Sequence, residues 1–258
     1  MTRSTAMAVI GGLLGMSVAL LRFMPAAWLQ PWIAQATEQR VQWINTSGSI
    51  WDGQTQWRLT GGQGAQDQQN LPGVWRWHLR PTWQQGPALA LQVEANCCLS
   101  QALQLQAAWT GGRTARWRLD DVSLVLPLQV LRGLGTPWNT LQLEGRLAVH
   151  TQELQAGEAQ QVRGQVRVDI ADVASRLSTV RPLGDYQATV QWPAQALPQV
   201  KLQTLSGHLK LEGQGQIAQG RLRFRGQASA SPDSEAALAN LLNIIGRRNG
   251  SVSVLTIG

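Results

Sequence analysis

The 258-residue sequence has little charge and few cysteines. Charged residues make up 14% of the chain, against about 25% in an ordinary soluble domain, so much of its polar surface comes from 32 glutamines. Two cysteines are too few for a disulfide-rich scaffold, and a hydrophobic content of 43% is too high for a wholly disordered chain. The sequence also has no collagen or heptad repeat. These absences favour one or two folded domains with a substantial core.

Motifs of common catalytic sites are also missing. We find no nucleophile elbow, Walker loop or dinucleotide fingerprint. His78, His150 and His208 each stand alone, without a second ligand at metal-site spacing. The adjacent Asp120 and Asp121 are more typical of a solvated turn than of an acid and base pair. We therefore expect no catalytic, metal-binding or cofactor-binding residues, no cofactor and no small-molecule substrate.

The excess of positive charge is concentrated in places. The 22 basic and 15 acidic residues give a net charge of +7, and one predicted strand carries a basic ladder of Arg221, Arg223 and Arg225 on one face. Phe224 falls on the opposite face, so the strand offers no mixed aromatic and cationic platform for bases, and we expect no nucleic-acid binding. The ladder is either a solvated outer face or a site for anionic lipid or an acidic partner.

The N-terminus carries the longest uncharged run. Sixteen residues, 6–21, lie between Arg3 and Arg22 without a charge, and a bilayer span needs about 20. Because Arg22 can snorkel and the apolar stretch resumes at Phe23, the sequence predicts a transmembrane anchor over 6–24. A cleaved signal peptide is the alternative, but residues 23–27 lack an A-x-A cleavage pattern.

Two features of this segment predict contacts. Gly11, Gly15 and Ala19 recur every four residues, which gives one helix face a small-residue stripe against which a partner helix can pack. Trp28 and Trp32 follow Arg22 at the spacing of a membrane-interface belt.

Beyond residue 40 the hydrophobic pattern has a period of two. Alternation in segments such as 75–79, 89–95, 103–107, 115–119, 141–149, 162–170 and 186–192 predicts a curved antiparallel β-sheet with hairpin-linked strands. Gly111-Gly112 predicts one hairpin turn, and Gly213, Gly215 and Gly220 are expected around the turn of a later hairpin. Helices are expected only at 126–134 and 234–245, with a closing strand at 252–257. The fold class is thus mainly β, with an N-terminal single transmembrane helix and one or two short helices.

Tryptophan and cysteine divide this β domain further. Eleven of the twelve tryptophans precede residue 139, so we expect a seam near 133–139 between a tryptophan-rich part and a part rich in Leu and Val. Cys97 and Cys98 are neighbours, which a strand would direct to opposite faces. They form either a vicinal disulfide or a buried thiol beside an exposed one.

Several segments together resemble a known family, protein N of the bacterial type II (general) secretion pathway. The matching pieces are residues 25–29 (PAAWL), 47–54 (SGSIWDGQ), 75–81 (WRWHLRP), 241–250 (LLNIIGRRNG) and 256–258 (TIG). They cover both ends and the first third of the chain, whereas residues 89–227 match in pattern only.

The resemblance implies a non-enzymatic accessory protein of the secretion machinery in the bacterial inner membrane. It predicts a cytoplasmic tail (1–5), the anchor (6–24), a juxtamembrane segment (25–40) and a periplasmic β-rich domain (41–258). Expected partners are other secretion proteins of the inner membrane and periplasm, together with membrane lipid. The family is also similar to β-rich envelope proteins of the AsmA type, so the alternative is a protein that binds or conveys lipid along an apolar sheet groove.

Overall fold

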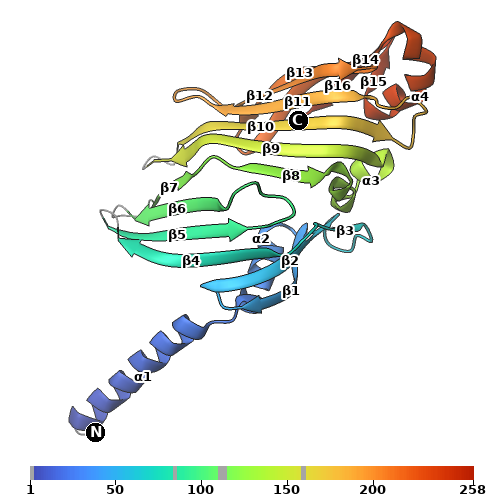
Figure 1. Cartoon of the computed structure of the whole chain (residues 1–258). Coiled ribbons are helices and arrows are strands. Elements are labelled where there is room, and N and C mark those ends of the chain that lie inside the picture. The colour runs from blue at the N-terminus through green and yellow to red at the C-terminus, as the bar shows by residue number, and fades with distance from the viewer. Residues whose placement is uncertain (1–2, 84–85, 110–114, 158–160) are drawn as a thin grey trace.

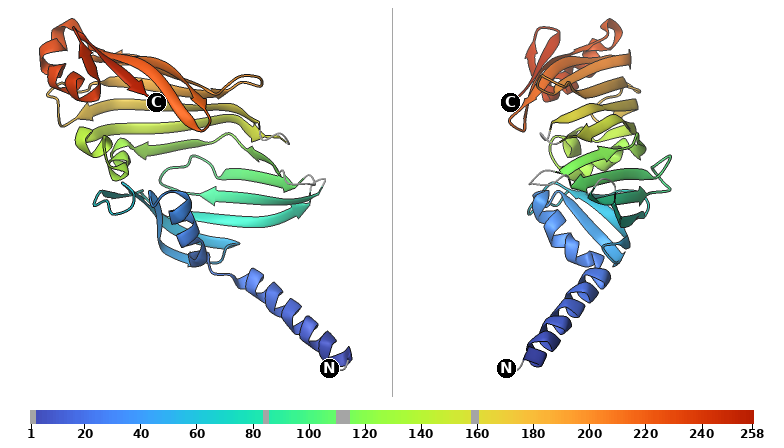
Figure 2. Two further views of the ribbon diagram at one scale, coloured as in Figure 1. Left: turned by 180° about the vertical axis from the view of Figure 1, so that it is seen from behind. Right: turned by 90° about the vertical axis from the view of Figure 1, so that its left-hand side faces the viewer.

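A computed structural model describes residues 3–83, 86–109, 115–157 and 161–258. One long, twisted sheet forms the body, α1 projects from one end and α4 lies at the other (Figure 1). The side view in Figure 2 shows the strands stacked along the length of the molecule with α1 directed away from them. The predicted turn at Gly111-Gly112 lies outside the described residues.

The N-terminal region is helical and is fastened to the first hairpin. It contains α1 (Arg3–Phe23), the 3₁₀ helix η1 (Ala26–Leu29) and α2 (Gln30–Ala36). Trp51 Nε1 donates a hydrogen bond to the Leu21 carbonyl at 2.7 Å, and the Ile50 amide donates to the Met24 carbonyl at 3.0 Å. Within the described part of the chain, none of the helices combines the length and the apolarity required to cross a bilayer. The predicted transmembrane span is therefore not confirmed.

The described residues of the first half of the sheet form seven strands. They are β1 (Val41–Gly48), β2 (Asp52–Thr60), β3 (Gln68–Asn70), β4 (Trp75–Trp83), β5 (Pro87–Glu94), β6 (Leu103–Trp109) and β7 (Ala115–Leu119). All neighbours pair antiparallel, and β2 is shared, because its first residues pair with β4 and its last with β3. The alternation of Trp75, Trp77 and Leu79 with polar residues thus forms a strand, as predicted.

The second half of the sheet follows the short elements β8 (Ser123–Pro127), η2 (Leu128–Leu134) and α3 (Trp138–Leu141). Its strands are β9 (Leu143–Ala156), β10 (Val162–Ser175), β11 (Gly184–Trp192), β12 (Gln199–Gly207), β13 (Leu209–Ala218), β14 (Arg221–Ala230), β15 (Arg247–Asn249) and β16 (Val252–Ile257). Between β14 and β15 lie η3 (Pro232–Ser234) and α4 (Glu235–Ile245). Consecutive strands from β9 to β14 are neighbours, and β16 closes on β14, so the expected hairpin order and closing strand are confirmed.

The two halves of the sheet meet around β9. β7 pairs with β9 through two residues only, Trp117 and Arg118, while β8 pairs with the opposite end of β9. The 3₁₀ helix η2 lies at this junction and contributes to both cores: Val130 is buried in the core of the first half and Leu128 in that of the second.

Three local predictions need correction. The predicted helix 126–134 is a strand up to Pro127 and a 3₁₀ helix from Leu128, because Pro127 is extended. Leu141, assigned to a strand by its spacing, ends α3. Gly213 and Gly215 lie inside β13 and not in the turn that follows it. The Phe224 ring on the adjacent strand fills the space where a Cβ on Gly213 would stand, and the Arg223 carbonyl oxygen fills that space at Gly215.

Candidate functional site

The predicted small-residue stripe on α1 has no partner among the described residues. Apart from the neighbouring backbone of α1 itself, no described heavy atom lies within 4 Å of the place that a Cβ on Gly11 or Gly15 would occupy, and Ala19 is exposed. Large apolar side chains of α1 are exposed as well, among them Leu14 at 62%, Val18 at 65% and Phe23 at 74%. Apolar side chains therefore surround α1 without protein cover in this single chain.

The predicted interface residues lie where α1 gives way to the sheet. The Arg22 guanidinium is 5.8 Å from the centroid of the Phe23 ring. Trp28, in η1, is 55% exposed, and Trp32, in α2, is 73% exposed. These residues lie along the same short stretch of chain and leave their aromatic surface uncovered.

The basic ladder occupies the outer face of β14. Arg221, Arg223 and Arg225 are exposed, whereas Phe224 between them is buried on the inner face. Lys201 on β12 lies on the same outer face, and together with Arg223 and Arg225 it lines an open groove of about 940 Å³. The described ion pairs do not include any of these four cations. Three more arginines converge on a single carboxylate further along the sheet.

That second cationic cluster surrounds Glu144. Its oxygens lie 3.3 Å from Nη2 of Arg132, 3.5 Å from Nε of Arg176 and 3.8 Å from Nη1 of Arg181. Arg132 is fixed by the carbonyl of Leu143 as well, while the side chains of Arg176 and Arg181 are 63% and 52% exposed. Three positive charges therefore share one negative charge. We call this group the Glu144 cluster.

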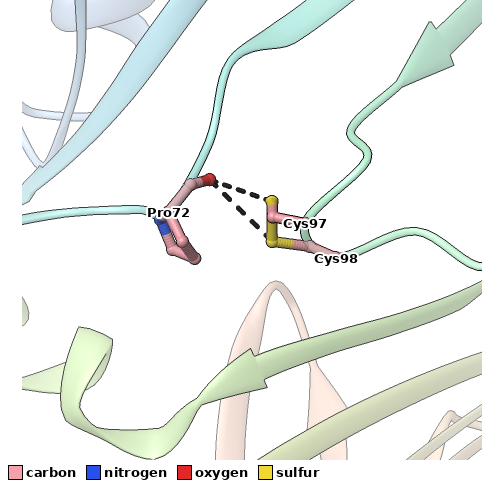
Figure 3. The surroundings of a disulfide bond; sticks show 3 residues. All are labelled: Pro72, Cys97 and Cys98. Carbon is pink, nitrogen blue, oxygen red and sulfur yellow. Dashed lines mark hydrogen bonds between the residues drawn. A yellow bond between two sulfur atoms is a disulfide. The ribbon is translucent and has the colours of Figure 1, made fainter.

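The two cysteines form a vicinal disulfide in the loop between β5 and β6 (Figure 3). The Pro72 carbonyl oxygen is 3.0 Å from Cys97 Sγ and 3.8 Å from Cys98 Sγ. Because disulfide sulfurs carry no proton, these are close contacts and not hydrogen bonds. Of the two alternatives predicted for the pair, the disulfide is the one that the structure contains.

Histidines and acidic residues make separate pairs. His78 Nδ1 is 2.7 Å from an Asp52 carboxylate oxygen, and this hydrogen bond lowers the pKa of Asp52 below its usual value. His150 lies 3.6 Å from Asp169, and His208 3.0 Å from the Ser234 hydroxyl. Over the part of the chain that is described, His, Cys, Asp and Glu form no group of three that could hold a metal ion.

An apolar cavity lies on the inner face of the second half. It has a volume of about 460 Å³, and all twenty residues that line it are Leu, Ile, Val, Ala, Phe, Trp or Tyr. The lining comes from η2, α3, α4 and strands β9 to β14 and β16. Alternation identifies the inner-facing residues of these strands, but it does not reveal whether that face is covered.

Tyr186 carries one of the few polar atoms in the lining, and that atom is occupied. Its hydroxyl donates a hydrogen bond to the Leu209 carbonyl at 2.9 Å. Burial raises the pKa of Tyr186, so the phenol stays protonated and neutral. The cavity therefore presents hydrocarbon and aromatic surface, with no charged group in its wall.

Comparison with known proteins gives one match. A family model described as Type II secretion system (T2SS), protein N matches residues 39–255, which include almost the whole sheet from β1 to β16. Neither the curated proteins nor the solved structures contain a significant match to this chain.

Proposed function

The chain belongs to the type II secretion system protein N family, and on that premise we propose that it is a non-enzymatic accessory component held at the inner membrane by α1, with its sheet in the periplasm contacting other secretion subunits. The observation that carries this proposal is the extent of the family match, which spans the sheet as one unit. Membership of this family also supports a location in the bacterial envelope.

Membrane attachment is supported by the surface of α1. A helix whose large apolar side chains are more than half exposed, such as Leu13 at 60% and Met16 at 63%, is stable only against lipid or another apolar surface. Trp28 and Trp32 stand beside it with exposed aromatic rings that suit the headgroup region. The proposal is attachment, and it does not require α1 to cross the bilayer.

Contact with other subunits is assigned to the outer face of the second half. Lys201 and the basic ladder give this face a positive charge without acidic partners in the described ion pairs. Positive surface attracts acidic protein surfaces and orients them before contact. We assign the ladder to an acidic partner and the stripe of Gly11, Gly15 and Ala19 to a partner helix.

Photocross-linking in intact cells tests the assignment. A photoreactive amino acid is placed at Arg223 on the outer face, and a matched probe at Trp83, which is exposed on β4 in the other half. Adducts of the Arg223 probe to secretion subunits, absent from the Trp83 probe, would support the proposed surface. Equal adducts at both positions, or none to any secretion subunit, would contradict it.

Substitutions separate the two contact regions. Gly11→Leu with Gly15→Leu should reduce recovery of partners in mild detergent while the sheet stays folded. Arg221→Gln, Arg223→Gln and Arg225→Gln together should weaken partner binding and remove its dependence on salt. Unchanged recovery in the first variant would remove the stripe from the proposal, and unchanged, salt-insensitive binding in the second would reduce the ladder to a solvated face.

Lipid conveyance is the second candidate, and the apolar cavity is the observation that favours it. However, every lining residue lies between Leu128 and Ile257, so the cavity belongs to the second half of the sheet. A conveying groove would have to continue along the first half, where the inner face carries the tryptophan cluster of Trp43, Trp57, Trp75 and Trp77. The secretion role is therefore preferred.

A further inference from the structure

Two neighbouring hairpins of the first half, β4–β5 and β6–β7, end in exposed tryptophans. We propose that these hairpin ends dock on an anionic lipid surface as a second membrane contact beside α1, with the indole rings among the head groups and arginines on the lipid phosphates. This contact builds on the proposed attachment by α1, and it would set how the sheet stands on the membrane.

The exposed apolar residues of the hairpin ends lie together on one face of the sheet. Trp83 is 79% exposed, Trp109 is 51% exposed and Leu89 is 44% exposed. Trp83 pairs with Pro87, two residues before Leu89, and Leu89 pairs with Ala107, two residues before Trp109. Residues that pair directly, and residues two apart on a strand, share a face. The three side chains therefore form one uncovered apolar patch.

The hairpins project past the place where α1 is fastened to the sheet. Trp51 donates its indole hydrogen bond to the Leu21 carbonyl of α1, and the turn that carries Trp51 ends at Asp52, which pairs with His78. From His78, β4 continues for five residues to Trp83, roughly 17 Å at the antiparallel rise of about 3.4 Å per residue. The hairpins end on the side of the sheet toward which α1 runs (Figure 1, Figure 2), so their ends extend toward a membrane that α1 contacts.

The same hairpin ends carry positive charge. Residues 79–91 and 105–119 contain no aspartate or glutamate, and Arg80, Arg116 and Arg118 are exposed there. Basic residues close to a membrane are attracted by the negative surface potential of anionic lipids. The charge of the hairpin ends therefore complements an anionic lipid surface.

A groove on these ends offers a place for a phosphate group. It has a volume of about 430 Å³, and its lining includes Ala88 and Ala108 from the hairpin ends together with Arg116, Arg118 and Arg163. Arg118 has one carboxylate 3.9 Å away, whereas the described ion pairs include neither Arg116 nor Arg163. Guanidinium groups bind phosphate oxygens through paired N–H donors, so the groove suits the head group of a phospholipid.

A membrane fits this arrangement better than a protein partner does. Ala88 in the groove alternates with Leu89 in the apolar patch, so the arginines and the rings lie on opposite faces of the same hairpins. Lipid can surround such an edge and contact both faces, whereas a stable protein interface needs about 800 Å² of surface on each partner. An indole ring, with an apolar body and a polar N–H, also prefers the head-group layer of a bilayer.

Fluorescence quenching by lipid tests the proposal on the full chain. The protein is reconstituted in phosphatidylcholine vesicles, with and without phosphatidylglycerol, and carries a fluorescent amino acid at Leu89. A matched probe is placed at Leu197, which is 49% exposed in the loop before β12 and further along the sheet from α1. A phosphatidylcholine with a nitroxide near its head group should quench the Leu89 probe and not the Leu197 probe.

Substitutions separate the aromatic contribution from the cationic one. Trp83→Ser with Trp109→Ser should lower the ratio of docked to undocked ends at least about tenfold, since half-burial of one indole removes roughly 100 Å² from water. Arg116→Gln with Arg118→Gln should lower this ratio about 25-fold with phosphatidylglycerol present, at about fivefold for each arginine, and much less without it. Trp83→Ser alone should give a smaller loss and serves if the double tryptophan variant perturbs folding.

A third probe, at Met16 on α1, distinguishes the hairpin contact from the attachment by α1. Quenching at Met16 without quenching at Leu89 would overturn the hairpin contact and leave attachment by α1 in place. Quenching at Leu89 alone would support the hairpin contact and contradict attachment by α1, and quenching at neither would overturn both. Equal quenching at Leu89 and Leu197 would overturn the assignment to these two hairpins. A photocross-link from Leu89 to a secretion subunit, without quenching, would assign the patch to a protein and overturn the lipid contact.

Discussion

In the first half of the sheet four tryptophans fill the inner face, whereas in the second half leucine, valine and isoleucine line an open cavity. The rings of Trp43 and Trp77 lie with centroids 5.0 Å apart, and those of Trp57 and Trp75 5.8 Å apart. Large aromatic rings bury more area per residue than aliphatic side chains. The first half therefore covers its inner face with side chains from the strands themselves.

The second half depends on added elements for the same purpose. The helix α4 and the 3₁₀ helix η2 cover part of its inner face through Leu238, Leu242 and Leu128, which are almost fully buried. The strands between them have smaller side chains, and Gly213 and Gly226 leave space that the Phe224 ring takes up. One continuous sheet thus combines an inner face that its own strands fill with one that stays partly open.

The largest expected effect is removal of a ring from the tryptophan cluster. Trp75 is 7% exposed, so Trp75→Ala should lower the free energy of unfolding by about 3–5 kcal/mol. Chemical denaturation followed by circular dichroism measures it. Trp83→Ala is the matched control, because that side chain is 79% exposed and should cost little. Similar losses in the two variants would mean that the cluster does not stabilise the first half.

A smaller loss is expected in the second half. Leu238 is fully buried in α4, and Leu238→Ala should cost about 2 kcal/mol, near the lower end for such a change, because the open cavity beside it lets the neighbours relax. The control is Ile244→Ala in the same helix, where the side chain is 44% exposed. A loss as large as that of Trp75→Ala would contradict the distinction between a filled and an open inner face.

The sequence predicted the strands better than it predicted the difference between the filled inner face of the first half and the open inner face of the second. Period-two alternation located β4, β5 and β10 because it reports which side of a strand is apolar. It could not report that α4 covers one part of that side and leaves another open. The helix predicted over 126–134 was wrong at its start, since Pro127 favours the extended backbone that ends β8.

The Glu144 cluster shows a second limit of prediction from sequence, because its residues lie far apart in the chain and meet only in the fold. Arg132 comes from η2, Glu144 from β9, and Arg176 and Arg181 from the loop between β10 and β11, so no spacing in the sequence links them. The basic ladder was predictable because its members alternate within one strand. The stripe of Gly11, Gly15 and Ala19 stays a prediction, because no helix among the described residues packs against it.

A third prediction concerns the β-bulge at Asp172, where the register of β10 shifts against both of its neighbouring strands. Asp185 accepts a hydrogen bond from the Asp172 amide at 2.8 Å and from the Ser206 hydroxyl at 2.7 Å. These two bonds, the Ser206 hydroxyl first, lower the pKa of Asp185 below its usual value. Asp185→Asn should cost about 1 kcal/mol at neutral pH.

The pH dependence gives the sign of that effect. Because the folded-state pKa is lowered, the stabilisation is fully present above the ordinary aspartate pKa and is lost as pH falls through the lowered value. Denaturation midpoints of the wild type and Asp185→Asn should therefore converge as the solution is made acidic. A difference between them that is constant from neutral to strongly acidic pH would show that the carboxylate charge is not responsible.

The smallest effect is expected from the disulfide of the first half. A disulfide stabilises mainly by restricting the unfolded chain, and this restriction grows with loop length. Cys97 and Cys98 are adjacent, so their bond closes the shortest loop that two residues can form. Reduction also gives Cys97 a thiol proton that can be donated to the Pro72 oxygen already beside it.

We expect reduction to change the free energy of unfolding by less than about 1 kcal/mol, against about 2–4 kcal/mol for a disulfide that closes a long loop. Denaturation with and without reductant measures the change, and Cys97→Ser with Cys98→Ser controls for effects of the reductant elsewhere. A larger loss would mean that the first half relies on this bond to hold the loop against Gly73, and not on its tryptophans alone.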